Sequence, residues 1–575
     1  MSFVRRARAR RDTSMPHTRG RPSRPAALVS LLAVMLAALW FGMLELRGLY
    51  FPDEGRYAEI PREMKATGDW VTPRLNGFPY FEKPPLQYWV TAAIFSVAGE
   101  DEWTTRLAPA FAGLAGVLAL LVTARRLHSR RAAWMAAAVL ASSWGYFLSS
   151  QFVTLDMALT AFLTSALCAF LLAQDARASP ADNRRWMLVA WALCALAVLT
   201  KGVIGVVLPA LAIATYVALR RDVALLRRLH IGSGLVVLAV IAAPWFMLAE
   251  ARNPGFAEFF FIHEHLQRFT QPLHRRPGAW WYFIPIAIAF LMPWLPAIVA
   301  ALTHRVRTGP AAIRSGVFDA SFFCWCWAAA IFVFFSVSSS KLPAYIMPAM
   351  GAVALGAAAP LAARWRLTTR RTAWTLIACG ITLATLALPA ATWINVPPVR
   401  QAFSENVGWV VAAAATLAAG GIGALWLLHA RRRVHALAVL VVASIAAGQL
   451  GTVLAYRIDG YYSAERLIER IAGGEILRPF RPEIPFYSVD MFDHTVPFYL
   501  RRTVTLVHEK GELAWGIAAA PANFIDDFGE FDRRWRASDA AYAIMRGETY
   551  ARLRGTDFPM RLLDSDDRRV IVARR

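Results

Sequence analysis

Residues 50–89 read YFPDEGRYAEIPREMKATGDWVTPRLNGFPYFEKPPLQYW. This stretch is dense in carboxylates, Arg, Lys, Tyr, Pro and Gly, although it lies between two long apolar runs. A loop that only joined two membrane helices could be shorter and less polar. We therefore interpret the stretch as one wall of a functional site, with Asp53 near one end and Glu82 and Lys83 near the other.

The composition of the whole chain is that of an integral membrane protein. Of its 575 residues, 57% are hydrophobic and only 18% are charged, whereas soluble domains contain fewer apolar and more charged residues. The net charge of +23 does not indicate nucleic-acid binding, because Arg and Lys cluster in short runs between apolar segments, as in the loops of membrane proteins. All five cysteines lie in apolar runs, so we interpret them as buried small side chains rather than disulfide partners or zinc ligands.

Apolar runs long enough to cross a bilayer recur up to residue 456. We expect about 13 transmembrane helices, and therefore a polytopic α-helical membrane protein. The expected spans are 26–43, 105–124, 132–150, 155–173, 186–200, 203–219, 232–250, 281–302, 319–337, 342–361, 372–392, 408–428 and 434–455. Residues 1–25 are expected to form a basic cytoplasmic tail before an uncleaved first helix. With the N-terminus inside, every predicted cytoplasmic loop is rich in Arg, so the helix count and the orientation support each other.

This alternation divides the chain into a membrane domain at 26–456 and a C-terminal domain at 457–575. The membrane domain includes two long outer loops, 48–104 and 251–280, which face the periplasm if the protein is bacterial. The C-terminal domain lies on the same side and is predicted to be α/β, with an amphipathic helix at 463–472 and strands at 485–489, 503–507, 542–545 and 570–573. Its size suits an independent unit, and it contains no glycine-rich nucleotide-binding motif.

Polar clusters crowd this outer face, where ionisable groups near a membrane indicate function. Two clusters lie in the first loop, and their main members are Asp53, Glu54, Arg56, Tyr57, Tyr80, Glu82 and Lys83. The third is Asp156 in QFVTLDMAL, at the outer start of a span. Structural alternatives exist: Asp53 could cap a helix, and Glu82 with Lys83 could be a solvated ion pair. Asp156 lies inside an apolar run, where a carboxylate without a function is rare, so we favour function there.

The fourth cluster is FIHEHLQRFTQPLHRR at residues 261–276. His263 and His265 alternate, so on a helix they face different sides, and His263 with a carboxylate of the first loop makes a better metal pair. Arg268 suits a phosphate, because its planar guanidinium matches phosphate oxygens. In SSSKLPAYIMP at 338–348, Lys341 and Tyr345 could hold an anionic headgroup, although an ammonium extended to the membrane surface explains Lys341 equally well.

Several of these motifs together resemble the lipid A aminoarabinose transferase family. They are the stretch at 52–89, the Asp of TLDM, the KG at 201–202 and SSSKLPAYIMP. The family is similar to protein O-mannosyltransferases and oligosaccharyltransferases, which share the membrane-embedded GT-C fold. The resemblance covers the whole chain. It implies a GT-C-like membrane domain, a large first outer loop and a C-terminal α/β domain.

The resemblance also implies an activity and a set of site residues. The activity is inverting transfer of 4-amino-4-deoxy-L-arabinose from undecaprenyl phosphate to a lipid A phosphate, which lowers the negative charge of lipopolysaccharide and protects against polymyxin. The implied catalytic acids are Asp53, Asp156 and Glu82. The implied ligands of the donor phosphate are Lys83, Arg268 and Tyr345. The implied cavity residues are Arg56, Tyr57, Tyr80, Lys201 and Lys341. A divalent metal on Glu82 and His263 is the one optional cofactor, and membrane lipids surround the protein.

Two other functions fit parts of the pattern. Another polyprenyl-phosphate-sugar transferase, like a protein O-mannosyltransferase, would share much of the first-loop motif. A lipid or sugar transporter would also be polytopic, but transporters usually place ionisable residues at mid-membrane and often show repeat symmetry. In this chain the acids crowd one face, which favours a transferase.

Overall fold

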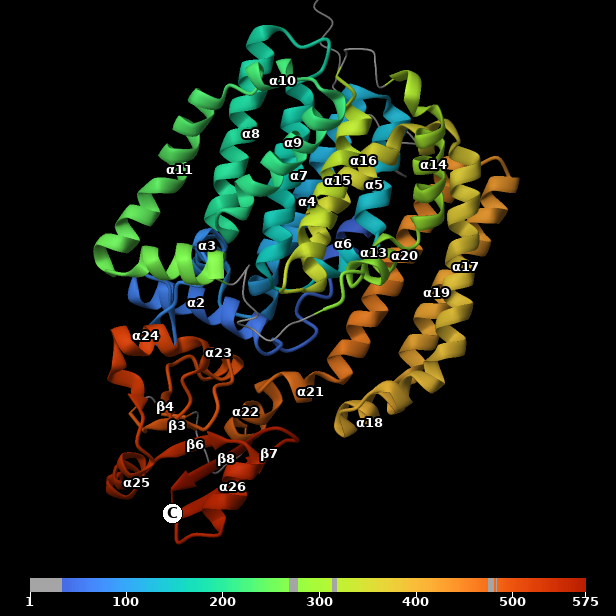
Figure 1. Ribbon diagram of the computed structural model, residues 1–575. Helices are drawn as coiled ribbons and strands as arrows, with labels where there is room; N and C mark the ends of the chain where they lie inside the picture. The colour runs from blue at the N-terminus through green and yellow to red at the C-terminus, as the bar shows by residue number, and fades with distance from the viewer. Residues whose placement is uncertain (1–33, 268–277, 313–317, 474–479, 482, 575) are drawn as a thin grey trace, which may run out of the picture.

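The structure, a computed structural model, describes the chain except for residues 1–33, 268–277, 313–317, 474–479, 482 and 575 (Figure 1). A bundle of long helices forms the larger part of the molecule, and the C-terminal residues form a smaller α/β domain at one end of the bundle (Figure 1). Helices α2 (Asp53–Thr67), α23 (Thr495–Leu500) and α24 (Ala514–Ala519) lie where the two parts meet.

Within the described residues, eight helices are long and apolar enough to cross a membrane, and a bent pair would make nine. The eight are α4 (Glu102–Leu127), α7 (Leu155–Ala173), α11 (Ile231–Arg252), α15 (Ala320–Val337), η2 with α16 (Pro343–Ala363), α17 with η3 (Trp365–Trp393), α19 (Val407–His429) and α20 (Arg433–Arg457). The bent pair, α13 (Phe283–Leu291) and α14 (Leu295–Ala312), turns by 107°. The chain is therefore a multi-pass membrane protein.

These helices confirm the fold class, and they differ from the expected spans in some places. The expected span 132–150 is divided into α5 (Arg130–Ser142) and α6 (Trp144–Ser149), and 281–302 is the bent pair. The spans 186–200 and 203–219 lie in α8 (Pro180–Lys201) and α9 (Ile204–Arg220). Residues 34–41 are helical, but the start of the span 26–43 lies outside the described residues. The number thirteen therefore stays a prediction.

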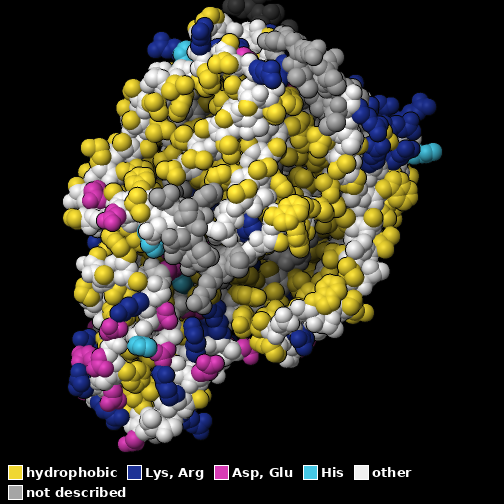
Figure 2. All heavy atoms as spheres, viewed as in Figure 1, with side chains coloured by type: hydrophobic (Ala, Val, Ile, Leu, Met, Phe, Trp, Pro, Cys, Tyr) yellow, Lys and Arg dark blue, Asp and Glu magenta, His cyan; other side chains and the backbone are white. Residues whose placement is uncertain are grey.

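The surface changes character between the two parts of the molecule. Figure 2 shows apolar side chains spread over the helical part, whereas acidic and basic side chains alternate over the C-terminal domain. Basic side chains also gather at the opposite end of the bundle (Figure 2). An apolar band between two charged ends is the distribution expected of a protein that lies in a bilayer.

The first outer loop is folded. It forms α2 (Asp53–Thr67), a hairpin of β1 (Arg74–Leu75) and β2 (Phe78–Pro79), and α3 (Leu86–Ala98). Acids in the first turn of α2 favour its start, and Gly68 ends it in the left-handed conformation at φ 70°. Asn76 and Gly77, both with positive φ, make the two-residue turn of the hairpin. The Asn76 amide also bonds the backbone of Val504, which connects this loop to the C-terminal domain.

The C-terminal domain contains one six-stranded sheet in the order β5-β4-β3-β6-β8-β7. Its strands are β3 (Phe486–Val489), β4 (Thr505–Val507), β5 (Phe524–Ile525), β6 (Tyr542–Met545), β7 (Met560–Ser565) and β8 (Val570–Arg574). Strands β5, β4, β3 and β6 are parallel, and β8 and β7 continue the sheet in antiparallel pairs. Four strands were expected close to these positions. The two-residue β5 and the half-exposed β7 have too few apolar residues for a clear pattern.

One face of the sheet packs against helix α25 (Phe528–Ala537), and the other face shares its core with the first outer loop. Tyr57, Ile60 and Met64 of α2 belong to the same buried cluster as Phe486 and Ile544 of the sheet. Helices α22 (Glu465–Ala472) and α24 (Ala514–Ala519) contribute to this cluster too. The C-terminal domain and the first outer loop therefore share one apolar core. The domain boundaries at residues 25 and 456 stay predictions.

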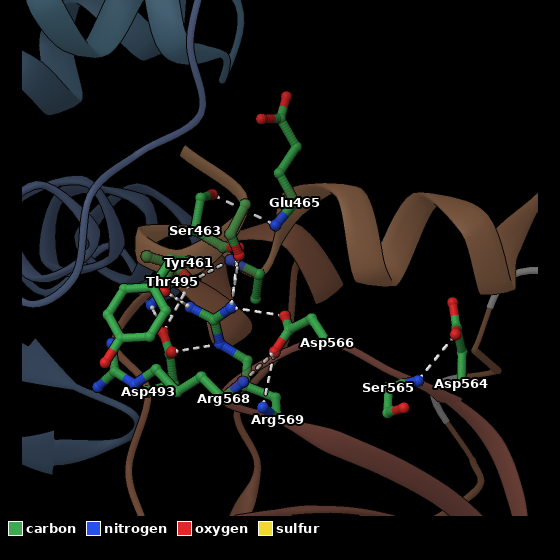
Figure 3. A network of polar contacts seen from close by, with 12 residues as sticks. Tyr461, Ser463, Glu465, Asp493, Thr495, Asp564, Ser565, Asp566, Arg568 and Arg569 are labelled. Atoms are coloured by element: carbon green, nitrogen blue, oxygen red, sulfur yellow. Dashed lines mark hydrogen bonds and ion pairs between the residues drawn. The ribbon is translucent and has the colours of Figure 1, made fainter. Parts of the chain in front are cut away.

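A buried arginine fixes the start of the C-terminal domain. Figure 3 shows Arg569, just before β8, between Asp493 and Asp566. Its Nε lies 2.7 Å from Asp493 Oδ2, and its Nη1 lies 2.8 Å from Asp566 Oδ2 and 2.9 Å from the Ser463 carbonyl oxygen. The neighbouring Arg568 guanidinium lies 3.8 Å from the ring centre of Phe51, two residues before Asp53. The last hairpin of the chain thus contacts the segment that leads into α2.

Candidate active site

Two adjacent acids at the start of α2 have different environments. The Glu54 side chain is 2% exposed, and it accepts hydrogen bonds from the guanidinium groups of Arg47 and Arg106. It also accepts a bond of 3.0 Å from the Val153 backbone NH. The Asp53 side chain is 54% exposed. Glu54 therefore joins segments of the fold, and Asp53 is the acid of the pair that a substrate can reach.

Asp53 is held by Arg56, one turn further along α2. Arg56 Nη1 donates to Asp53 Oδ1 over 2.8 Å. The other side of the same guanidinium binds Glu512 of the C-terminal domain, with Nε 2.8 Å from Oε1 and Nη2 2.6 Å from Oε2. Burial would raise the pKa of Glu512, but Arg56 and His494 outweigh it and lower this pKa to about 2. Glu512 is therefore ionised at neutral pH.

Glu82 and Lys83 lie between β2 and α3. Lys83 Nζ donates to the Glu82 carbonyl oxygen over 2.6 Å, and it lies 3.5 Å from Glu264 Oε2. Burial raises the pKa of the Glu82 carboxyl; Lys83 opposes this shift and Glu264 adds to it. Lys83 therefore lies between two carboxyls, those of Glu82 and Glu264.

Asp156 and Lys201 form a second acid–cation pair at the ends of two membrane helices. Asp156 lies in the first turn of α7, Lys201 is the last residue of α8, and Lys201 Nζ donates to Asp156 Oδ1 over 2.5 Å. The ammonium also lies 4.9 Å from the ring centre of Tyr345 in η2 (Pro343–Ile346). The Asp156 side chain is only 13% exposed, so this pair is less accessible to solvent than Asp53.

These groups surround one cavity of about 600 Å³, which we call the polar cavity. Its lining includes Asp53, Arg56, Tyr57, Glu82, Lys83, Asp156, Lys201, Phe259, His263, Glu264, Tyr345, Glu512 and Trp515. A second cavity of about 420 Å³, the apolar pocket, lies beside it between membrane helices. The two share Lys83, Asp156, Lys201, Glu264 and Tyr345. A charged boundary between a polar and an apolar cavity suits an amphiphile with an anionic headgroup.

Two predicted site residues, Tyr80 and Lys341, are not among the described lining. Tyr80 is buried, with its ring centre 5.9 Å from the Arg56 guanidinium, and does not line either cavity. Lys341 donates to the carbonyl oxygens of Ser336 and Ser338 over 2.8 and 2.7 Å, at the end of α15, where a cation stabilises the helix terminus. Lys341 is not among the described lining of either cavity, and its place at the substrate stays a prediction. Arg268 lies outside the described residues.

The metal pair of Glu82 and His263 stays a prediction. Glu82 and His263 both line the polar cavity, and His263 lies on a π-helix (Glu258–Gln267) with its Nδ1 3.5 Å from Glu264 Oε1. Across the part of the chain that the structure describes, no three His, Cys, Asp or Glu side chains are grouped to hold a metal ion. We therefore assign no step to a metal.

The sequence analysis missed the contribution of the C-terminal domain. Glu512 and Trp515 line the polar cavity from 3₁₀-helix η4 (Gly511–Leu513) and α24. The Trp515 ring stacks on Phe259 at 5.3 Å, and Phe259 stacks on His263 at 5.3 Å, so three aromatic rings form one side of the cavity. No local pattern around Glu512 marks it, because its partner Arg56 lies 456 residues earlier.

Comparison with known proteins agrees with this geometry. A family model described as "Aminoarabinose transferase C-terminal domain" matches residues 474–574, and one described as "Dolichyl-phosphate-mannose-protein mannosyltransferase" matches residues 26–260. The undecaprenyl phosphate-α-4-amino-4-deoxy-L-arabinose arabinosyl transferase of Pseudomonas aeruginosa (strain UCBPP-PA14) is 31% identical over 502 residues, 85% of this chain and 86% of the relative. The transferase of the same name from Shewanella sediminis (strain HAW-EB3) is 32% identical over 332 residues, 57% of this chain and 58% of the relative.

A solved structure extends the similarity to the whole fold. The crystal structure of ArnT from Cupriavidus metallidurans bound to undecaprenyl phosphate superposes with a TM-score of 0.87 at 36% identity, covering 95% of this chain and 98% of that one. Its apo form gives a TM-score of 0.86. From the length of these matches, the chain belongs to the family of undecaprenyl phosphate-α-4-amino-4-deoxy-L-arabinose arabinosyl transferases.

Proposed function

We propose that this protein transfers 4-amino-4-deoxy-L-arabinose from undecaprenyl phosphate to a phosphate of lipid A. Family membership supports the sugar and the polyprenyl carrier. The observation that carries the proposal is the joined pair of cavities, in which one lining is apolar, the other is acidic, and cations lie at their boundary. A lipid-linked amino sugar has the same three parts in the same order.

This order supports one arrangement of the donor. Its polyprenyl chain enters the apolar pocket between the membrane helices, and its phosphate lies at the boundary beside Lys83, Lys201 and Tyr345. The aminopentose then extends into the polar cavity toward Asp53 and Glu512. At neutral pH the sugar amine is a cation, and the surplus of carboxylates in this cavity offsets its charge.

The reaction follows from this placement. An oxygen of the acceptor phosphate attacks the anomeric carbon of the pentose, and the bond from that carbon to the donor phosphate oxygen breaks. Undecaprenyl phosphate leaves with the bonding electrons, and attack from the opposite face inverts the configuration. Lys83 and Lys201 offset the negative charge that develops on the leaving phosphate.

Asp53 acts on the sugar side of the reaction. An acceptor phosphate is already ionised, so it does not need a strong general base. The accessible carboxylate, held by Arg56 at 2.8 Å, can orient the sugar amine and stabilise positive charge at the anomeric carbon. Asp156, paired with Lys201, keeps that ammonium at the phosphate end.

The cellular consequences are part of the proposal. The Arg-rich loops and the position of the C-terminal domain support an inner-membrane protein whose site faces the periplasm. Addition of an amino sugar there lowers the negative charge of lipopolysaccharide. Cells with the active protein are then expected to resist polymyxin and other cationic peptides better than cells without it.

A reconstituted assay tests the proposal. The purified full-length protein is mixed with the lipid-linked aminopentose and lipid A, and the mass of the lipid A product is measured by mass spectrometry. We expect an increase of one aminopentose that depends on the donor. Sugar on a protein acceptor, or movement of the lipid across vesicles without transfer, would favour a mannosyltransferase-like enzyme or a transporter instead.

A further inference from the structure

The C-terminal domain contributes a charged side chain to the polar cavity at the same point as Asp53. Glu512 binds both the Nε and the Nη2 of Arg56, while the remaining Nη1 binds Asp53. On its other side, Glu512 Oε1 lies 2.7 Å from His494 Nε2. The order His494, Glu512, Arg56, Asp53 therefore connects the C-terminal domain to the accessible acid of the site.

The Glu512 carboxylate leaves the Arg56 guanidinium little freedom to rotate. A guanidinium that binds a carboxylate through two parallel bonds is fixed in both position and orientation. The Glu512 side chain is 23% exposed and that of Arg56 is 10% exposed, so water competes weakly for these bonds. Glu512 occupies Nε and Nη2 of Arg56, so Nη1 is the nitrogen left for Asp53. Glu512 therefore sets the direction in which Nη1 points.

The position of Glu512 relative to α2 is itself fixed. The backbones of α2 and α23 (Thr495–Leu500) approach so closely that a Cβ on Gly55 would lie 2.7 Å from the backbone of His494. The Phe51 backbone NH also donates to the Tyr462 carbonyl oxygen over 2.9 Å. Together with the shared apolar core, these contacts hold the C-terminal domain against the start of α2.

We propose that the C-terminal domain is a working part of the transfer site, and that Glu512 is a positioning residue that orients Asp53 through Arg56. This inference rests on the proposed function, and it adds a role for a domain that has no glycine-rich nucleotide-binding motif. Glu512 does not need to touch the reacting atoms. Its effect is to keep Arg56 from closing fully over Asp53, so that the Asp53 carboxylate stays available to the sugar.

The consequence can be separated from a general loss of structure. Without the charge of Glu512, Arg56 is free to pair fully with Asp53. The donor lipid is still held by its chain and its phosphate at the other end of the cavity. We therefore expect a lower kcat with little change in the donor KM, whereas unfolding would lower the amount of active protein and leave both constants of the remainder unchanged.

The test compares E512Q with a matched control in the same domain. Glu530 on α25 is also paired with arginines, at 2.6 Å to Arg533 and 2.7 Å to Arg534, but it does not line either cavity. In the full-length protein, E512Q is expected to lower kcat by about 10–100-fold and to change the donor KM by less than about threefold. E530Q is expected to match the wild type in both constants.

A double-mutant cycle tests the route through Arg56. Lysine cannot bind two carboxylates in the way that a guanidinium does, so R56K already breaks the connection. If Glu512 acts through Arg56, E512Q lowers kcat by less than about twofold in the R56K background, because both changes break the same connection. Independent multiplication of the two losses would overturn the inference.

A measurement without substrate separates this inference from the proposed function. Carbodiimide modifies the protonated carboxyl of an accessible acid, and labelling of Asp53 can be followed by peptide mass spectrometry. With Arg56 paired to Asp53 alone, we expect slower labelling of Asp53 in E512Q than in the wild type or in E530Q. Unchanged labelling would overturn the positioning role. Failure of the wild type to transfer the aminopentose would contradict only the proposed function.

Discussion

The polar cavity has two ends, and each contains an acid paired with a cation. At the membrane end, Asp156 and Lys201 come from the ends of two helices that pack along their length. At the domain end, Asp53 and Arg56 lie one turn apart on α2, and Glu512 of the C-terminal domain completes the group. The membrane end is a single pair beside an apolar pocket, whereas the domain end is a network that joins two parts of the chain.

The acids at the two ends, Asp156 and Asp53, differ in exposure, and this difference indicates different chemical roles. The Asp156 side chain is mostly covered and its oxygen is bound to an ammonium, which suits a role in holding Lys201 at a lipid phosphate. The Asp53 side chain is half exposed and faces the cavity. We therefore assign donor-headgroup binding to the membrane end and the sugar chemistry to the domain end.

The largest effect is expected from D53N. Asparagine keeps the size of the side chain but removes the charge that faces the sugar, so transfer should fall by roughly 1,000-fold or more. The melting temperature should change little, because the Asp53 side chain is half exposed. Initial rates of product formation and a thermal melt of the same preparation check both parts. Full activity of D53N would remove Asp53 from the site.

The next effect is expected from K83A at the boundary of the two cavities. Loss of this ammonium removes one charge that offsets the leaving phosphate, so kcat/KM for the donor should fall by about 10–100-fold. The acceptor KM should stay close to that of the wild type. Steady-state kinetics with each substrate varied in turn give both numbers. A change in the acceptor KM alone would contradict the assignment of the phosphate to this boundary.

A smaller effect on activity, with a larger one on stability, is expected from R569M. This change leaves the buried Asp493 without its arginine, which should cost roughly 3 kcal/mol of unfolding free energy. Movement of the C-terminal domain should lower kcat, whereas binding of undecaprenyl phosphate, at the membrane end, should be retained. Denaturant unfolding and a lipid-binding assay measure the two. Equal loss of lipid binding would show that the ends are not separable.

The smallest effect is a dependence of stability on pH at Glu82. Its pKa is raised above the ordinary glutamate range by burial, so the stability from its protonated form is complete below that range and is lost as the pH rises through the raised pKa. Glutamine does not titrate. The melting temperature of E82Q minus that of the wild type should therefore increase from pH 5 to pH 8.

The matched control is again E530Q. Hydrogen bonds from Arg533 and Arg534 lower the pKa of Glu530, so its charge is constant over the same pH range. The difference in melting temperature between E530Q and the wild type should stay flat from pH 5 to pH 8. A flat difference for E82Q as well would show that Glu82 is not held in the environment described.

Much of the membrane end was predictable from the sequence. Asp156 is a carboxylate inside an apolar run, and Lys201 ends another such run, so both are expected at helix ends on one side of the membrane. The pair Asp53 and Arg56 also follows from helical spacing, because residues three apart share a face.

The remainder depends on contacts between distant segments. Nothing near residues 53 and 54 shows which acid is buried, because Arg106 reaches Glu54 from another helix. Likewise, Glu512 looks like an ordinary surface glutamate until the fold places it on Arg56. Lys341 was expected at the cavity, but its ammonium donates to carbonyl oxygens at the end of α15.

The central claim is that one end of the cavity binds the donor lipid and the other end performs the transfer. The most direct test is the dissociation constant of undecaprenyl phosphate for purified D53N, with K83A measured beside it. We predict that D53N binds the lipid as the wild type does, although it does not transfer sugar, and that K83A binds it more weakly. Weak binding by D53N with normal binding by K83A would contradict the division.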